Sequence, residues 1–271
     1  MLYIVATPIG NLKEITIRAL EALQSVDYIL CEDTRTSAVL LNEYNIKKPL
    51  VAYHKFNEAQ NMVKIIEHLQ QGKEIALITD AGMPGISDPG NRLINALIEN
   101  NLPYTVISGA SAFINAFVLS GFSAPFTFVG FLPSKNSDRK ELLKDLKDYK
   151  SALVFYESPH DIHHTLAELY AVFGDRKFFI ARELTKKFES LYHGTLSNGY
   201  DGNTKGEFVL VVAGNDEASQ SPLMALSVEE HLKFYLDLGY MKNDAIEIVA
   251  KERNLKKNEV YKIATKFTVS R

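Results

Sequence analysis

Short apolar runs alternate with amphipathic segments along the first 120 residues. The runs have the length and continuous hydrophobicity of strands that are buried on both faces of a parallel sheet. They lie near residues 2–6, 27–31, 49–52, 74–79 and 104–107. The segments between them repeat apolar residues at helical spacing, as at Leu93, Leu97 and Ile98. This alternation predicts an N-terminal α/β domain over residues 1–120, with a mostly parallel sheet covered on both faces.

The pattern changes at Gly121 to Pro125, where glycine, serine and proline indicate a hinge. A second series of apolar runs follows, near residues 126–130, 151–156, 177–182, 189–195 and 207–213. The last three runs follow one another closely, so we expect their strands to be antiparallel. Together these runs predict a second α/β domain over residues 121–215.

Beyond a polar stretch from Gly214 to Pro222, which is typical of a linker, the pattern becomes helical. Residues 227–267 predict two or three short helices, and Lys256 to Tyr261 can begin the second helix of a helix-turn-helix-like unit. We therefore expect a small basic helical segment over residues 223–271.

The loop from Asp80 to Gly90 is the most informative stretch of the chain. It follows an apolar run and precedes a helical pattern, which is where open α/β sheets bind ligands. Its three glycines allow sharp turns and a close approach of the backbone to a ligand. Ser87 or Asp88 can cap the following helix, with Pro89 in its first turn. An ordinary connection of this kind is shorter, so the loop predicts a ligand site.

Two further loops have the same placement, at Thr7 to Leu12 and at Ser108 to Ala112. Neither contains the GxGxxG dinucleotide fingerprint, and the chain has no GxxxxGK[ST] phosphate loop. The three loops offer small side chains, hydroxyls and aspartate instead of a lysine over phosphates. They favour a ligand that has ribose hydroxyls and an amino-acid end over a polyphosphate.

Composition agrees with a globular protein of one large or two ordinary cores, because 46% of the 271 residues are hydrophobic. The chain has no apolar run of membrane-spanning length and begins directly with a strand pattern, so we expect neither a membrane span nor a signal peptide. The single cysteine, Cys31, ends an apolar run and is expected to be a core residue of a cytoplasmic protein.

Positive charge is concentrated at the C-terminal end. Residues 251–271 carry +5, whereas the whole chain carries −3, so the other 250 residues carry −8. The seven basic side chains are Lys251, Arg253, Lys256, Lys257, Lys262, Lys266 and Arg271. They form either a solvated helix face or a local patch for RNA phosphates, which needs no positive net charge overall.

A series of motifs extends from residue 2 to about residue 213. In order they are Ala6 to Leu12 with Ile15 and Thr16, Cys31 to Ser37, Asp80 to Gly90, Ser108 to Ala112, Gly130 to Pro133, Phe155 to His160, Ala181 to Lys186 and Gly206 to Val209. Together they resemble the small-subunit ribosomal RNA methyltransferase I family of the tetrapyrrole (class III) methylase superfamily. The chain departs from the family pattern at Met83, where threonine is usual, and at Asp161, where arginine usually follows Ser-Pro-His.

This resemblance implies an enzyme that uses S-adenosylmethionine to methylate the ribose 2′-hydroxyl of a cytidine in the decoding region of 16S ribosomal RNA. It also implies a homodimer with the cofactor in a cleft between two α/β domains. Asp80 is expected to accept a hydrogen bond from the methionine amino group or from a ribose hydroxyl. The implied cofactor-binding residues are Pro8, Asp80, Met83, Ser111, Ala112, Glu157 and Leu184.

A sugar hydroxyl is a poor nucleophile, so we expect an acidic or basic partner near it. Glu32 and Asp33 follow the second strand and are candidates, and Arg35 can bind the adjacent phosphate with two hydrogen bonds. Alternatively, this cluster is a capping network for the helix near Thr36, with Asp33 or Thr34 at its N-cap. Acidic residues before a helix suit either role.

Two other groups of charged or histidine residues have alternative interpretations. Arg182 and Lys186 follow a strand of the second domain and either bind substrate or form a strand-end salt bridge. His160, His163 and His164 share one helix face, but no cysteine or carboxylate completes a familiar zinc spacing. We expect exposed histidines and no metal.

Two other functions are compatible with these motifs. A methylase of tetrapyrrole or corrin rings shares the cofactor loops, but leaves the Glu32 to Arg35 cluster and the basic C-terminal segment unexplained. A non-catalytic RNA-binding protein on the same fold would bind S-adenosylmethionine without transferring its methyl group.

Overall fold

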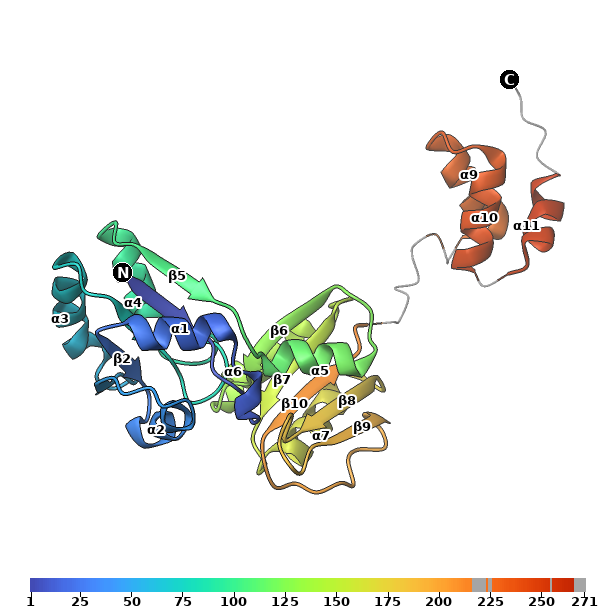
Figure 1. The fold of residues 1–271 in the computed structure, drawn as a ribbon. Coiled ribbons are helices and arrows are strands. Elements are labelled where there is room, and N and C mark those ends of the chain that lie inside the picture. The colour runs from blue at the N-terminus through green and yellow to red at the C-terminus, as the bar shows by residue number, and fades with distance from the viewer. Residues whose placement is uncertain (216–222, 224–225, 254, 266–271) are drawn as a thin grey trace. The chain divides into compact units, whose positions relative to one another are not determined.

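The computed structural model describes residues 1–215, 223, 226–253 and 255–265. The chain divides into two compact units, Met1–Gly214 and Asn215–Arg271 (Figure 1). Most of the predicted linker, together with Lys266 and Arg271, lies outside the described residues.

The first sheet has five strands in the order β3-β2-β4-β1-β5, and every neighbouring pair is parallel. Its strands are β1 (Leu2–Val5), β2 (Tyr28–Cys31), β3 (Leu50–Ala52), β4 (Ile75–Leu77) and β5 (Tyr104–Ile107). The predicted α/β class and parallel sheet are therefore confirmed.

Helices cover this sheet on both faces, as the alternation along the chain predicted. They are η1 (Leu12–Glu14), α1 (Ile17–Ser25), α2 (Thr34–Glu43), α3 (Glu58–Gln70) and α4 (Asn91–Glu99). Leu23 of α1 packs with Val5 and Ile29 on one face. Leu93 of α4 packs with Leu2 and Ile4 in a separate cluster, since successive strand residues point to opposite faces.

The N-terminus of α4 corrects one sequence prediction. Neither Ser87 nor Asp88 caps this helix; its N-cap is Gly90, and Pro89 precedes the helix. The Gly90 amide instead donates to the buried carboxylate of Glu58 on α3, over 3.0 Å. The Gly85 amide donates to the Pro89 carbonyl, so Ser87 and Asp88 belong to a separate turn.

The second sheet is mixed, in the order β6-β7-β10-β8-β9. Its strands are β6 (Phe126–Phe131), β7 (Ala152–Glu157), β8 (Lys177–Arg182), β9 (Ser190–Thr195) and β10 (Phe208–Val212). β6 and β7 are parallel, and all other pairs are antiparallel. The antiparallel prediction for the last three strands is confirmed, although β10 pairs between β7 and β8 and not beside β9.

Three helices pack on this sheet: α5 (Ala112–Ser120), α6 (Asn136–Leu146) and α7 (Ile162–Phe173). Leu143 of α6 and Leu166 of α7 join the core on one face, while Ala116 of α5 joins the core on the other. α5 precedes the predicted boundary at residue 120, yet it contacts β7, β8 and β10 of the second sheet. The exact boundary between the two α/β domains therefore stays a prediction.

The C-terminal unit contains α9 (Val228–Asp237), α10 (Lys242–Glu252) and α11 (Lys257–Ala264), which confirms the helices predicted over residues 227–267. Ser227 and Glu230 form a capping box at the start of α9. Leu232, Ile246 and Val249 are fully buried in the core of this unit. No helix in the described ranges is long and apolar enough to cross a bilayer.

Candidate functional site

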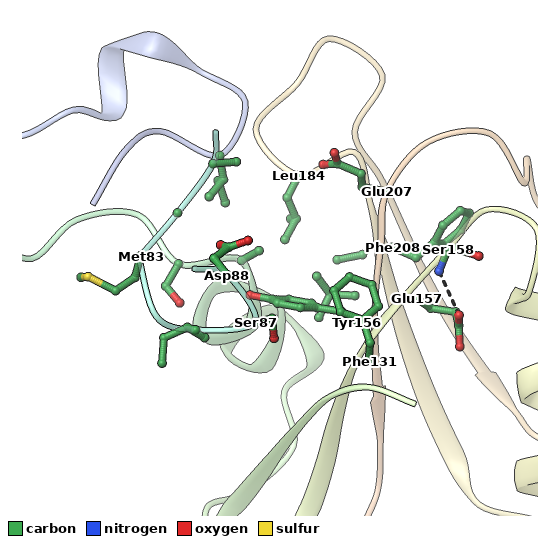
Figure 2. A pocket seen from close by; sticks show the side chains of 18 of the residues that line it. Met83, Ser87, Asp88, Phe131, Tyr156, Glu157, Ser158, Leu184, Glu207 and Phe208 are labelled. Carbon is green, nitrogen blue, oxygen red and sulfur yellow. Dashed lines mark hydrogen bonds between the residues drawn. The ribbon is translucent and has the colours of Figure 1, made fainter. Parts of the chain in front are cut away.

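A cavity of about 380 Å³ lies within the first unit, lined by residues of both sheets (Figure 2). The first sheet contributes the loops after β1, β4 and β5, through residues such as Ile9, Met83 and Ser111. The second sheet contributes Tyr156 and Glu157 at the end of β7, together with residues near the ends of β6, β8 and β10. The three loops that the sequence singled out therefore meet at one site.

Most of the residues predicted to bind a cofactor line this cavity. They are Met83, Ser111, Ala112, Glu157 and Leu184. Pro8 and Asp80 are not among the lining residues, but their chain neighbours Ile9 and Ala81 are. The arrangement supports the predicted set without testing it, so its role in cofactor binding stays a prediction.

The loop after β1 joins the two halves of the site. Thr7 and Gly82 exchange backbone hydrogen bonds of 2.9 and 3.1 Å, which fixes this loop against the loop after β4. On its other side, a Cβ added at Gly10 would lie 2.8 Å from the Leu184 carbonyl oxygen. Only glycine permits this close approach, because the neighbouring atom belongs to the backbone.

The segment after β8 is held in an unusual conformation. Glu183 and Thr185 both have positive φ angles, of 52° and 65°, and they flank the cavity-lining Leu184. Lys186 stabilises this segment through ion pairs of 3.0 Å with Glu183 and 2.9 Å with Glu207. Such backbone strain is concentrated at functional sites.

Arg182 and Lys186 were predicted to bind substrate, and both are engaged within the protein. The buried Arg182 guanidinium donates to the Ser190 hydroxyl and to the carbonyls of Phe188 and Lys205, over 2.8–2.9 Å. These contacts, like the ion pairs of Lys186, match the alternative of a strand-end network. The substrate role of the two residues stays a prediction.

The cluster after β2 forms the capping network that the sequence allowed. Asp33 is the N-cap of α2 and accepts from the Arg35 amide over 2.8 Å. The Arg35 guanidinium also donates to both Asp33 oxygens, which lowers the pKa of Asp33 to about 2. The Arg35 side chain is nevertheless 89% exposed, so it is accessible to a phosphate.

Acidic side chains gather at the carboxyl ends of β2 and β4. The Asp33 amide donates to Asp80 over 3.2 Å, which links the two strand ends. Burial raises the pKa of Glu32, and the charge of Asp80 raises it further. Burial, together with the charges of Glu32 and Asp80, raises the pKa of Asp88 to about 6. The site therefore has a negative field that suits a cation.

Glu157 lines the cavity but does not present its carboxylate to it. One oxygen accepts from the Ser158 amide over 2.9 Å, and the other accepts from the buried Thr165 hydroxyl. Figure 2 shows this carboxylate turned away from the centre of the cavity. The side chain therefore holds the end of β7 in place.

The cavity residues that sequence reasoning missed include Asp88, Phe131 and Tyr156. All three lie in or beside motifs noted in the sequence, but Asp88 was interpreted as a helix cap. Open α/β sheets bind ligands at the carboxyl ends of their strands, and this strand-end rule, applied to β7, would have pointed to Tyr156. Burial raises the pKa of its phenol to about 12.

The remaining chemical candidates do not line this cavity. His160, His163 and His164 are exposed, and no cluster of His, Cys, Asp and Glu within the described ranges is arranged to hold a metal ion. Cys31 is a free, buried thiol whose pKa is raised by burial, as expected of a core residue.

Sequence comparison finds relatives along nearly the whole chain. Residues 1–198 match the family described as Tetrapyrrole (Corrin/Porphyrin) Methylases. A protein from Halalkalibacterium halodurans named Ribosomal RNA small subunit methyltransferase I is 40% identical over 270 residues, which cover 97% of this chain and 93% of the relative. A protein of the same name from Mycoplasmopsis pulmonis is 50% identical over 214 residues, covering 78% of this chain and 96% of the relative.

Solved structures share the fold at low sequence identity. The methyltransferase CobJ has a TM-score of 0.61 at 16% identity, over 79% of this chain and 93% of that chain. A uroporphyrin-III C-methyl transferase from Thermus thermophilus, solved with S-adenyl homocysteine, has a TM-score of 0.57 at 13% identity, over 78% of this chain and 96% of that chain. These likenesses confirm the predicted fold class.

Proposed function

Because this chain belongs to the tetrapyrrole methylase family, and within it to the small-subunit ribosomal RNA methyltransferase I group, we propose that it methylates small-subunit ribosomal RNA. It is an S-adenosylmethionine-dependent methyltransferase. The RNA substrate is inferred chiefly from a relative of that name, which is 40% identical to this chain over 97% of its length. This favours RNA over a tetrapyrrole ring as the acceptor.

The cavity fits S-adenosylmethionine by size and by chemistry. Its volume of about 380 Å³ lies within the range of small-molecule sites, about 300 to 1,000 Å³. Asp88 and the neighbouring acidic side chains suit a sulfonium and an ammonium group, whereas Ile9, Phe131 and Leu184 offer an apolar wall. We assign cofactor binding to Pro8, Asp80, Met83, Ser111, Ala112, Glu157 and Leu184.

We take the acceptor to be the 2′-hydroxyl of a cytidine in the decoding region, methylated in the cytoplasm. The bound cofactor supplies an activated methyl group, so the protein contributes chiefly by holding donor and acceptor in line. Both sheets line the cavity, which gives the protein two independently fixed walls for this purpose. Glu32 and Asp33 remain candidates for a group that acts on the hydroxyl.

The proposed function is tested by methyl transfer to small ribosomal subunits from a strain that lacks the modification. We expect labelled methyl groups to enter the RNA at one cytidine ribose, and subunits that already carry the modification to accept none. Cofactor binding without transfer would favour a non-catalytic RNA-binding protein. Transfer to a tetrapyrrole ring but not to RNA would favour a ring methylase.

Arg35→Ala is expected to weaken RNA methylation about tenfold while cofactor affinity stays the same. The exposed guanidinium is proposed to contact a phosphate beside the target nucleotide, and one charged hydrogen bond contributes about 1.5 kcal/mol. Steady-state kinetics with varied RNA, together with calorimetry for S-adenosylmethionine, measure the two effects. A parallel loss of both would assign Arg35 to the cofactor site or to folding.

We also propose a homodimer that pairs through the first α/β domain. β5 is an edge strand of its sheet, and Val106 on it is 48% exposed. Tyr104 on the same strand is 39% exposed. Apolar side chains on an uncovered edge are typical of an interface.

Light scattering at micromolar concentration is expected to give twice the mass of one chain. Val106→Lys should give the mass of one chain, because a lysine on an edge strand opposes pairing. Val39→Lys is a matched control, since Val39 on α2 is 62% exposed. α2 follows β2, and β4 and β1 lie between β2 and β5 in the sheet. A monomeric wild-type protein would refute the dimer.

A further inference from the structure

Three carboxylates line the cavity, and they differ in what their oxygens contact. Both oxygens of Glu157 accept hydrogen bonds within the protein. Glu207 is paired with Lys186 over 2.9 Å, and its side chain is 77% exposed. Asp88 accepts no hydrogen bond from any described residue, although it is only partly exposed. It is therefore the lining carboxylate that has both oxygens free of hydrogen-bond partners among the described residues.

The backbone fixes Asp88 in this position. Ser87 before it has a φ angle of 63°, a left-handed conformation that is costly for a residue with a Cβ. The turn is closed by the bond from the Gly85 amide to the Pro89 carbonyl, over 3.1 Å. It rests against β6, where a Cβ added at Gly130 would lie 3.2 Å from the Ser87 hydroxyl. The strained backbone and its contacts therefore hold the Asp88 side chain in one position.

Figure 2 shows the surroundings of Asp88 inside the cavity. The hydroxyl of Tyr156, from the second sheet, points toward the side of the cavity that Asp88 occupies. The charged groups that act on Asp88 are Glu32 and Asp80, from the ends of β2 and β4. A cation in the cavity and a hydroxyl that enters it would both meet the same carboxylate.

We propose that Asp88 is the proton acceptor for the RNA hydroxyl during methyl transfer. The inference rests on the proposed function and assigns a further catalytic residue to that site. Glu32 was the earlier candidate for the proton acceptor, but Glu32 does not line the cavity, whereas Asp88 does.

The reaction balances with Asp88 in this role. The hydroxyl oxygen forms a bond to the methyl carbon while the carbon–sulfur bond breaks, and the electron pair of that bond remains on sulfur. The hydroxyl proton moves to the Asp88 carboxylate and leaves to solvent after the product departs. No oxidant, reductant or metal ion is required.

Charge placement makes Asp88 a better base than an ordinary aspartate. Burial and the charges of Glu32 and Asp80 raise its pKa to about 6, so it is mostly ionised at neutral pH yet binds a proton more tightly than usual. A base whose pKa lies near the working pH is the effective one.

Asp88→Asn is the direct test, measured at saturating RNA and S-adenosylmethionine. We expect a fall in kcat of about 100-fold or more, because general-base catalysis contributes about 10² to 10⁴. S-adenosylmethionine affinity should fall by no more than about tenfold, because the loss concerns at most one contact of this carboxylate with the cofactor cation. The wild-type kcat should rise with pH through about 6, and the variant should lose this dependence. Asp145→Asn, an exposed carboxylate on α6, controls for the loss of one charge.

Glu32→Gln separates the two candidate bases. Removing the Glu32 charge should lower the pKa of Asp88, so the rise in kcat should move to lower pH without disappearing. If Glu32 were the base, this variant would lose the pH dependence and Asp88→Asn would keep it, which would overturn the proposal.

A measurement without substrates completes the test. Carboxyl ¹³C spectra of the ligand-free protein should show one aspartate that titrates near pH 6, absent in Asp88→Asn and shifted to lower pH in Glu32→Gln. A large loss of S-adenosylmethionine affinity with kcat preserved would make Asp88 a donor-binding residue and overturn the proposal. If the wild-type protein methylates no RNA, the proposed function fails, and the inference fails with it.

Discussion

Asp80→Ala is expected to weaken S-adenosylmethionine binding about 100-fold while the protein stays folded. Asp80 is exposed at the end of β4, next to the cavity-lining Ala81, and it is proposed to accept a hydrogen bond from the cofactor. A hydrogen bond to a charged group contributes about 1.5 to 3 kcal/mol, and about 2.7 kcal/mol corresponds to 100-fold in affinity. Isothermal calorimetry on the full-length protein measures the change.

Asp80→Asn identifies the cofactor group that Asp80 contacts. Asparagine keeps a hydrogen-bond acceptor but loses the charge, so it should restore most of the affinity if the partner is a ribose hydroxyl. It should behave like alanine if the partner is the methionine ammonium group. Both variants lose or weaken the contact with the Asp33 amide, so the melting temperature should fall by only a few degrees. Unchanged affinity in both would remove Asp80 from the cofactor site.

The strands of this protein could be predicted because of where they lie. β1, β2 and β4 are flanked by other strands and covered by helices on both faces, so each is a nearly unbroken apolar run. The position of β10 could not be predicted in the same way. β10 lies between β7 and β8 because it pairs with strands that are distant in the sequence. The residues 207–213 themselves do not indicate which strands these are.

The residue pattern alone predicted the site to the level of loops, whereas the individual cavity-lining side chains, such as Met83 and Ser111, came from the family resemblance. The strand-end rule selected the loops after β1, β4 and β5, and all three line the cavity. The role of Asp88 was misread, because serine and aspartate before a helix are usual caps. The N-cap is instead Gly90, whose amide donates to Glu58, 32 residues away in the chain. Such a contact is a property of the tertiary structure.

None of the described residues of the C-terminal unit lines the cavity. Every residue that lines the cavity lies in the first unit, between Ile9 and Val209. The Mycoplasmopsis pulmonis relative is matched over 96% of its own length, yet it covers only 78% of this chain. That relative therefore has no counterpart for a part of this chain as large as the C-terminal unit. We infer that this unit adds RNA affinity and does not take part in methyl transfer.

Neutralising four exposed lysines of this unit is expected to flatten the salt dependence of RNA binding strongly. The residues to be changed to glutamine together are Lys251, Lys256, Lys257 and Lys262. Each phosphate contact contributes about 0.7 to 0.9 to the slope of log K against log salt, so the loss of four lowers the slope by about 3. Binding to small subunits, measured from low to high salt, gives the slope.

A matched quadruple variant shows whether position or net charge is responsible. Lys140, Lys144, Lys147 and Lys150 on and after α6 are also exposed, and changing them to glutamine removes the same charge from the first unit. The core of the C-terminal unit, at Leu232, Ile246 and Val249, is untouched in both variants, so neither should lower the melting temperature appreciably. If this helical unit only covers apolar surface, its lysine variant keeps the wild-type slope. Equal flattening in both variants would indicate a general effect of net charge, whereas flattening confined to the C-terminal variant places the phosphate contacts on α10 and α11.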